Sequence, residues 1–444
     1  MRTPSTPSRS LLARPAAIAA GVALLVGAAG VGTRARADTI DPSMPRVVVV
    51  GPPRGEAPSE RLDPHRTGRS RSRLPATPVE LWRRHVSGTI DVPPLVDADG
   101  NVLVALTNPP ELVKLAPDAH ELWRARLGVA GAALAPTLLG DGTIAVIAAT
   151  GTAWGFTPGG VVRFSTPLGI ARRDADTIPL ALADGGLLVA AGNVVIELDA
   201  DGIVRARGAL EDRSLMAPMA LTAAGAAGGT ERAVGAVVDS PGGPLVTTAT
   251  GGVYRFRPPA APRKIGSFGG TPSRGAMLAD DRTLVAVVDG RRVVALDLPT
   301  GTTHVRAGGV LFDAPPVLGP GGLLLVTTQL GMLVGLDALG NEKLHLMLDK
   351  IAPPGVGVGV GGTFLGGAGG GELKPSPSLV IDPGGRVAFL RANGRVGVVT
   401  LAEAPGHVEI AAEKVCPGPV SLVPAGEKRM LIACRDGGLW MYGE

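Results

Sequence analysis

The chain has 444 residues, and its 65 Gly and 40 Pro argue against a mainly helical fold. Hydrophobic residues make up 45% of the chain but aromatic residues only 3%, so a core must be built from Val, Leu and Ala, as in thin β-layers. The length suits two ordinary domains or one repetitive architecture with a distributed core. The net charge is +4, but residues 1–79 carry +7 and residues 80–444 carry −3, which argues against nucleic-acid binding.

Residues 1–37 have the parts of a secretory signal peptide. Three Arg precede an apolar, Ala- and Gly-rich stretch over residues 15–32, and Ala35-Arg36-Ala37 forms an A-x-A cleavage site. We expect cleavage between Ala37 and Asp38. The alternative is an uncleaved membrane anchor, although the apolar stretch is short for a span. The mature chain is then exported to the periplasm or the cell surface and has no integral membrane span.

Residues 38–79 carry eight Pro and seven Arg. Such a stretch buries too little apolar surface to offset the entropy lost on ordering. We therefore predict a disordered Pro/Arg-rich linker. Its basic run at residues 69–73 has a second interpretation, contact with an anionic membrane or polymer surface.

From residue 80 onward, a pattern of four short strands recurs and is clearest in residues 314–348. A Pro-containing entry strand, a Val/Leu/Thr strand, a strand ending in Leu-Asp and an alternating exit strand are separated by Gly-rich turns. Most third strands follow one another at 40–43 residues, which matches a four-stranded propeller blade. The two longer intervals, of 58 and 63 residues, contain insertions near residues 211–230 and 350–374. The large residues of the third strands are Leu115, Phe156, Leu198, Phe256, Leu296, Leu336, Val399 and Tyr442.

The two ends of this region complement each other. The eighth third strand, residues 438–442, lies at the C-terminus, so its blade has no exit strand of its own. Residues 79–86, with Trp82, are similar to the exit strand of the first blade, which contains Trp123. Pairing them with the last blade removes open sheet edges. We predict an all-β, eight-bladed propeller over residues 80–444, monomeric and closed by residues 79–88.

The repeat resembles the pyrroloquinoline-quinone-type (PQQ-like) propeller repeat. The best matches are residues 293–297 with Thr300-Gly301, residues 333–337 with Gly340, and Glu121-Leu122-Trp123. Among exported propellers of this size, the chain is most similar to BamB-type outer-membrane assembly proteins, although it has no lipobox Cys. The resemblance implies a non-catalytic scaffold that binds an envelope or secreted protein. We expect the insertions near residues 211–230 and 350–374 to contact the partner, because extra length without a core-forming pattern is tolerated only at loops.

The only two cysteines, Cys416 and Cys434, flank a predicted hairpin turn in the last blade. Their midpoint is residue 425, so a regular hairpin centred there places them opposite each other across the ladder. For an exported chain we predict the disulfide Cys416–Cys434. Two reduced structural cysteines are the alternative.

Few residues suggest catalysis or metal binding. No two Cys are adjacent, and no position matches the Ca²⁺ ligands of PQQ-dependent dehydrogenases, which makes that enzyme class the weakest alternative. We interpret Asp297 and Asp337, which follow third strands, as turn formers. The Gly-rich run at residues 355–371 is interpreted as a loop between blades. The histidines are scattered and predicted at the surface: His65, His85, His120, His304, His345 and His407.

The sequence therefore predicts no catalytic residue, no cofactor and no metal site. A protein-binding scaffold is the preferred function. The principal alternative is a sensor that binds a ligand or glycan in the central funnel of the ring.

Overall fold

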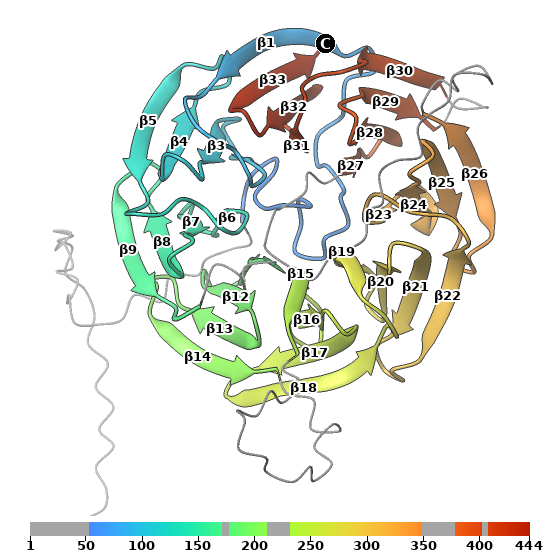
Figure 1. Ribbon diagram of the computed structural model, residues 1–444, viewed down its shortest axis with the longest axis horizontal. Helices are drawn as coiled ribbons and strands as arrows, with labels where there is room; N and C mark the ends of the chain where they lie inside the picture. The colour runs from blue at the N-terminus through green and yellow to red at the C-terminus, as the bar shows by residue number, and fades with distance from the viewer. Residues whose placement is uncertain (1–52, 171–176, 211–230, 349–377, 402–406) are drawn as a thin grey trace, which may run out of the picture. The chain divides into compact units, whose positions relative to one another are not determined.

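The computed structural model describes residues 53–170, 177–210, 231–348, 378–401 and 407–444. Contacts divide the chain between Val48 and Val49, and every described residue belongs to the second unit. Within this unit, eight β-sheets surround a central axis (Figure 1). The predicted all-β, eight-bladed propeller is confirmed.

Each blade has four antiparallel strands, with the entry strand at the inner edge. The entry strands of blades 1–8 are β2 (Leu95–Val96), β6 (Thr137–Leu138), β11 (Leu180–Ala181), β15 (Ala233–Val238), β19 (Pro272–Asp280), β23 (Val317–Leu318), β27 (Ser378–Ile381) and β31 (Pro419–Pro424). The second strands are β3 (Val102–Ala105), β7 (Ile144–Ile147), β12 (Leu187–Ala191), β16 (Leu245–Thr248), β20 (Thr283–Val288), β24 (Leu324–Thr327), β28 (Arg386–Leu390) and β32 (Arg429–Cys434).

The two outer strands complete each blade. The third strands are β4 (Glu111–Leu115), β8 (Thr152–Phe156), β13 (Val194–Leu198), β17 (Gly252–Arg257), β21 (Arg292–Asp297), β25 (Met332–Leu336), β29 (Val396–Thr400) and β33 (Gly438–Gly443). The exit strands are β5 (Glu121–Arg126), β9 (Val162–Pro167), β14 (Val204–Ala209), β18 (Ala260–Ser267), β22 (Thr303–Gly308), β26 (Glu342–Met347), β30 (His407–Ala412) and β1 (Val79–His85). All eight large residues assigned to third strands lie on these third strands, which confirms the predicted period.

Two features depart from a simple repeat. The short strand β10 (Thr177–Ile178) precedes blade 3 but pairs in parallel with β15 of blade 4. A short 3₁₀ turn, Pro320–Gly322, joins β23 to β24. The predicted closure is present, because β1 pairs antiparallel with β33 and completes blade 8.

The core is distributed in layers between neighbouring blades. Successive side chains of a strand point to opposite faces of its sheet, so each middle strand contributes to two layers. In β3, Leu103 and Ala105 pack in the layer shared with blade 2, whereas Val102 and Val104 pack in the layer shared with blade 8. This arrangement explains how a chain with few aromatic residues forms a core.

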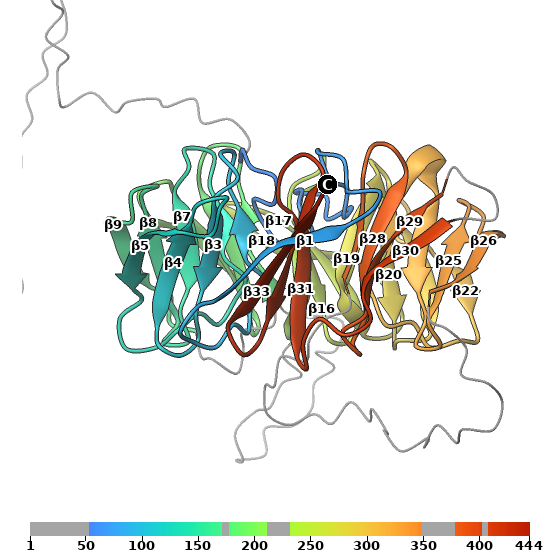
Figure 2. The same ribbon diagram turned by 90° about the horizontal axis from the view of Figure 1, so that it is seen from above.

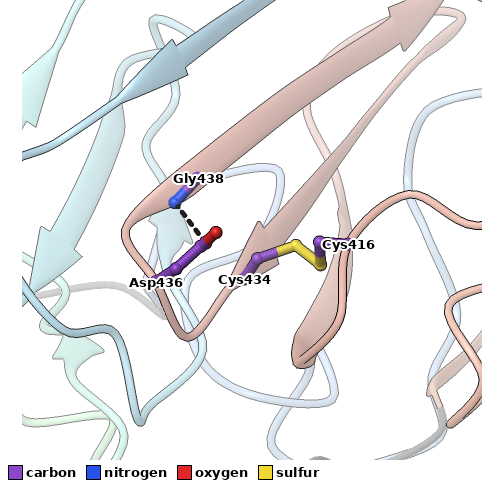
Figure 3. The surroundings of a disulfide bond; sticks show 4 residues. All are labelled: Cys416, Cys434, Asp436 and Gly438. Atoms are coloured by element: carbon purple, nitrogen blue, oxygen red, sulfur yellow. Dashed lines mark hydrogen bonds between the residues drawn. A yellow bond between two sulfur atoms is a disulfide. The ribbon is translucent and has the colours of Figure 1, made fainter.

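The disulfide Cys416–Cys434 is present in blade 8, with the two Cα atoms 6.4 Å apart (Figure 3). Its predicted place in the ladder is wrong. The pairs Leu422–Ile432 and Val423–Leu431 centre the hairpin on residue 427, and a register shift puts Pro419 opposite Cys434. Cys416 therefore lies before β31, and the bond ties this preceding segment to the second strand of the blade.

The disordered linker predicted for residues 38–79 is wrong for residues 53–78. Ala57, Leu62 and Leu74 are buried, and Arg66 has no exposed surface. The inner edges of the blades supply hydrogen-bond partners and apolar contacts that the segment does not contain itself, and these offset its ordering entropy.

Several predictions concern residues outside the described ranges. They are the signal peptide with its cleavage site at Ala37 and Asp38, the first part of the linker, the insertions at residues 211–230 and 350–374, and the Gly-rich run at residues 355–371. No helix among the residues that the structure describes is long and apolar enough to cross a membrane.

Candidate functional site

Residues 53–78, called the axial segment below, run through the middle of the ring before the chain enters β1 (Figure 1). Seen from the side, the axial segment lies toward the face that carries the C-terminus (Figure 2). The C-terminus ends a third strand, and first and third strands run in the same direction. This face therefore carries the turns that follow the first and third strands of the blades.

Seven blades each donate one backbone N–H to a carbonyl of the axial segment. In six blades the donor lies at or near the end of the entry strand, and in blade 8 it is Lys428 in the turn between β31 and β32. The bonds measure 2.8 to 3.0 Å. The acceptors follow the order of the blades, so the segment circles the axis once. The donor and acceptor pairs are Val96 to Ala57, Leu138 to Pro58, Asp239 to Pro64, Leu278 to His65, Leu318 to Thr67, Ile381 to Gly68 and Lys428 to Arg73.

Arg66 connects the segment to the remaining blade. Its Nη2 donates to the carbonyl of Pro179 at the entry of blade 3 (2.6 Å), and its Nε donates to the carbonyl of Val237 in blade 4 (3.0 Å). Its Nη1 donates to Ser59 Oγ (2.7 Å) and to the carbonyl of Glu60 (2.9 Å) within the segment. Burial lowers the pKa of Arg66 to about 10, so the guanidinium stays charged at neutral pH. The three carbonyl oxygens and the Ser59 hydroxyl that accept its hydrogen bonds compensate for its loss of hydration.

Further bonds fix the second half of the axial segment. Arg69 donates to the carbonyls of Leu318 (2.6 Å) and Gly319 (2.7 Å) in blade 6. Leu74 donates its N–H to Asp382 Oδ2 (2.9 Å), and the Leu74 carbonyl accepts from Arg386 Nη1 (2.9 Å). The centre of the ring on this face is thus filled by the chain itself.

A cleft of about 470 Å³ lies between blades 7 and 8. Blade 8 contributes Trp440, Tyr442 and Arg83, and blade 7 contributes the small side chains of Ala411 and Ala412. Lys414 and Glu80 complete the charged part of the lining. Burial, with a contribution from Glu80, raises the pKa of the Tyr442 hydroxyl, which therefore stays protonated at neutral pH.

Two exit strands each place a Trp against a turn of the next blade. Trp82 of blade 8 donates from Nε1 to the Pro117 carbonyl of blade 1 (2.9 Å), and Trp123 of blade 1 donates in the same way to Pro158 of blade 2 (3.0 Å). The strand pairings place Glu409 at the equivalent position of blade 7. Blade 7 therefore makes no such indole contact with blade 8.

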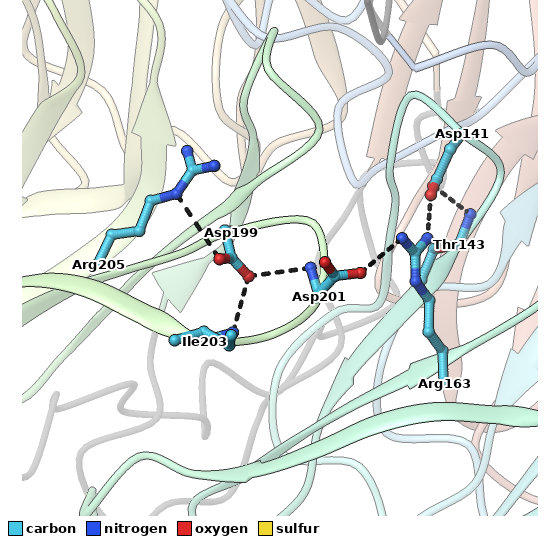
Figure 4. A network of polar contacts seen from close by, with 7 residues as sticks. All are labelled: Asp141, Thr143, Arg163, Asp199, Asp201, Ile203 and Arg205. Carbon is cyan, nitrogen blue, oxygen red and sulfur yellow. Dashed lines mark hydrogen bonds and ion pairs between the residues drawn. The ribbon is translucent and has the colours of Figure 1, made fainter. Parts of the chain in front are cut away.

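Ion pairs on the outer rim join adjacent blades and belong to the scaffold (Figure 4). Arg163 on β9 of blade 2 pairs with Asp141 of the same blade and with Asp201 of blade 3, the latter at 3.0 Å. Asp199 accepts the N–H groups of Asp201 (2.9 Å) and Ile203 (2.8 Å), which shapes the turn that presents Asp201. Arg205 approaches Asp199 at 3.9 Å. All five charged residues have partners among one another or in nearby backbone groups.

The residues considered for chemistry occupy structural or exposed positions. Asp297 accepts from the hydroxyl of Thr300 (2.5 Å), and Asp337 accepts from the N–H groups of Leu339 and Asn341 (both 2.9 Å), which confirms both as turn formers. All six histidines are exposed, as predicted. Within the described ranges, no three His, Cys, Asp or Glu side chains gather as metal ligands.

No family model and no curated protein matches the sequence. Among solved structures, a quinohemoprotein alcohol dehydrogenase from Pseudomonas putida has a TM-score of 0.59 at 11% identity, over 88% of this chain and 80% of its own. A computationally designed protein has a TM-score of 0.57 at 10% identity, over 83% of this chain and all of its own. BamB from Moraxella catarrhalis has a TM-score of 0.46 at 12% identity, over 83% of this chain and all of its own.

At these identities the likenesses show the fold alone. The eight sheets in the ring make the chain an eight-bladed β-propeller.

Proposed function

We propose that this chain is an exported, non-catalytic scaffold that binds a protein partner in the cell envelope, with outer-membrane protein assembly as the process. The observation that carries the proposal is the occupied axis. Seven blades donate a backbone N–H to the chain's own residues 53–78, and Arg66 of this segment donates to carbonyls of blades 3 and 4. The surfaces left for a partner are the rim, the turns and the clefts between blades, where rigid rings commonly present binding residues.

The cleft between blades 7 and 8 has the composition of a protein contact. Trp, Tyr and Arg are the residue types that dominate binding energy at interfaces, and Trp440, Tyr442 and Arg83 all line this cleft. The two insertions, at residues 211–230 and 350–374, are the second set of contacts that the proposal names. We propose that the chain acts as a monomer in the periplasm or at the cell surface.

Affinity capture from a native envelope fraction tests the proposal, with the full chain as bait. A Trp440→Ala bait should lose the specifically recovered envelope proteins, because the indole is the largest side chain of the cleft. Leu122→Ala is the matched control, since Leu122 is 45% exposed on the outer strand of another blade. Thermal unfolding of each bait shows first that the ring is intact. Recovery of no specific protein, or equal recovery by all three baits, contradicts the proposal.

A saccharide sensor is the second candidate, and the same cleft favours it over the central funnel. Indole and phenol rings stack on sugar rings, and Arg83 and Lys414 supply charged hydrogen-bond donors beside Trp440. Titration with acidic and neutral oligosaccharides, followed by tryptophan fluorescence, tests it. Saturable binding that is lost in the Trp440→Ala variant supports a sensor, and unchanged fluorescence at millimolar sugar rejects it.

A further inference from the structure

The inner edges of the blades present a repeated set of hydrogen-bond donors to the axis. An entry strand has a ladder partner on its outer side only, so the groups on its inner side need partners from elsewhere. In six blades an N–H at or beside the end of the entry strand donates to a peptide carbonyl of residues 53–78, and in blade 8 the N–H of Lys428, in the turn after the entry strand, does the same. A ligand that accepts hydrogen bonds from seven donors arranged around the axis must carry carbonyls spaced along a flexible chain. A polypeptide meets this requirement.

We propose that the ring axis is a binding site for an extended polypeptide, and that residues 53–78 are its resident, separable ligand. The mode is edge addition, in which main-chain bonds supply affinity and a few side chains supply selectivity. This inference concerns the axis and goes beyond the proposed scaffold function, which uses the outside of the ring.

The eight blades are complete without the axial segment. Blade 8 is closed by β1, and every blade has its four strands within residues 79–444. Among the described residues, the strand-like pairings of the axial segment with the blades are three isolated bridges, Ala57–Val96, Ser59–Thr137 and Arg69–Ile381. The segment therefore adds to finished sheets.

The axial segment also has local structure of its own. Leu62 donates its N–H to the Ser59 carbonyl, Arg66 donates to the Asp63 carbonyl (both 3.0 Å), and the Asp63 carboxylate accepts the N–H of Thr67 (3.2 Å). These bonds form a compact loop that presents Arg66 to blades 3 and 4. These internal hydrogen bonds restrict the segment before it binds, so less conformational entropy is lost when it binds to the ring.

Arg66 is the side chain on which selectivity depends. It is fully buried and donates to two carbonyls of the ring and two oxygen atoms of the segment. Arg71, five residues later, is exposed. The pair offers a matched comparison of a buried and an exposed guanidinium in one ligand.

The experiment uses the full chain with a protease recognition site inserted between Thr77 and Pro78. After cleavage, native mass spectrometry and gel filtration show whether the fragment ending at Thr77 stays bound. A fluorescent synthetic peptide of residues 53–77 then competes for the site. We expect saturable exchange, at least a ten-fold loss of affinity for the Arg66→Ala peptide, and less than a two-fold loss for the Arg71→Ala peptide.

Two results overturn the proposal. One is equal competition by the wild-type and Arg66→Ala peptides, and the other is unfolding of the ring when the fragment leaves. If the inserted site itself prevents folding, hydrogen exchange on the uncleaved chain decides the question. Arg66→Ala should accelerate exchange at the seven axial amides by at least ten-fold and leave the amides between second and third strands unchanged. Acceleration of both sets together contradicts a separable ligand.

Discussion

At the scale of single residues, carboxylates at the ends of third strands organise the turns of the blades. Asp337 Oδ1 accepts two backbone N–H groups, and its Oδ2 accepts from Asn341 Nδ2 (2.9 Å). Asp297 receives the N–H and the hydroxyl of Thr300. Both carboxylates accept hydrogen bonds from groups of their own turns. We therefore interpret the recurrence of Asp in the repeat as turn formation.

The pKa of Asp337 should depend on Asn341. The hydrogen bond from the Asn341 side chain is the main cause that lowers this pKa from 3.8 to about 2. A carboxylate with a lowered folded-state pKa stabilises the fold above its unfolded pKa, and this contribution is lost as the pH falls from about 4 to about 2. In Asn341→Ala, we expect the pKa to rise toward 3.8 in a carboxyl-carbon NMR titration. Lys343→Ala should shift it less, and a value near 2 in Asn341→Ala contradicts the assignment.

Buried and exposed ion pairs should differ in their effect on stability. Arg391 and Asp313 form a buried pair (2.6 Å) between blades 7 and 6, whereas Arg205 and Asp184 form an exposed pair within blade 3. Arg391→Ala leaves a buried carboxylate without its cation and should lower the free energy of unfolding by about 3 kcal/mol. Arg205→Ala should cost less than about 1 kcal/mol. Urea unfolding measures both, and equal losses contradict this ranking.

At the scale of elements, a turn of one blade receives an aromatic side chain from the exit strand of the preceding blade. Trp82 and Trp123 donate to the carbonyls of Pro117 and Pro158 in such turns. Gly160, in the second of these turns, has φ of 85° and lies directly beneath the indole of Trp123. Residues 79–86 and 119–127, which are similar in sequence, thus make the same contact with the next blade.

Gly160→Ala should weaken the contact between blades 1 and 2. An added Cβ meets the Trp123 ring at 2.7 Å, so steric overlap adds to the strain of a left-handed backbone. We expect a loss of about 2 to 4 kcal/mol in urea unfolding. Gly309→Ala is the control, because Gly309 has φ of 89° and no atom within 4 Å of an added Cβ. It should lose about 1 kcal/mol, and equal losses show that backbone strain alone acts at both positions.

At the scale of the whole molecule, the repeat predicted the blades but not the occupant of their axis. Strand patterns and turns are local, so residues such as Leu115 and Tyr442 could be assigned to third strands from spacing alone. The order of residues 53–78 depends on seven blades that lie far away in the sequence, and the segment has no periodicity of its own. The sequence indicated an ordered axial segment only indirectly, because the inner edges of eight predicted sheets need hydrogen-bond partners.

The cysteine pair also shows what local pattern can and cannot predict. The predicted hairpin indicated that Cys416 and Cys434 form a disulfide, but it did not give the correct strand register. The hairpin is centred on residue 427 instead of 425, and a register shift beside Pro419 puts Pro419 opposite Cys434. No rule of spacing predicts such a shift. The cleft between blades 7 and 8 was also missed. The repeat gave no signal for it, because its lining residues come from two blades that meet only in the folded ring.

The disulfide should matter most for closure of the ring, because it lies in the blade that joins the two ends of the fold. Cys416 and Cys434 are 18 residues apart and both buried. A loop of this size restricts the unfolded chain by about 3 kcal/mol. We expect the double variant Cys416→Ala/Cys434→Ala to lose about this much in urea unfolding. Reductant should destabilise the wild-type chain by a similar amount and leave the double variant unchanged. A wild-type chain that is insensitive to reductant under unfolding conditions contradicts a stabilising disulfide, since unfolding exposes the bond.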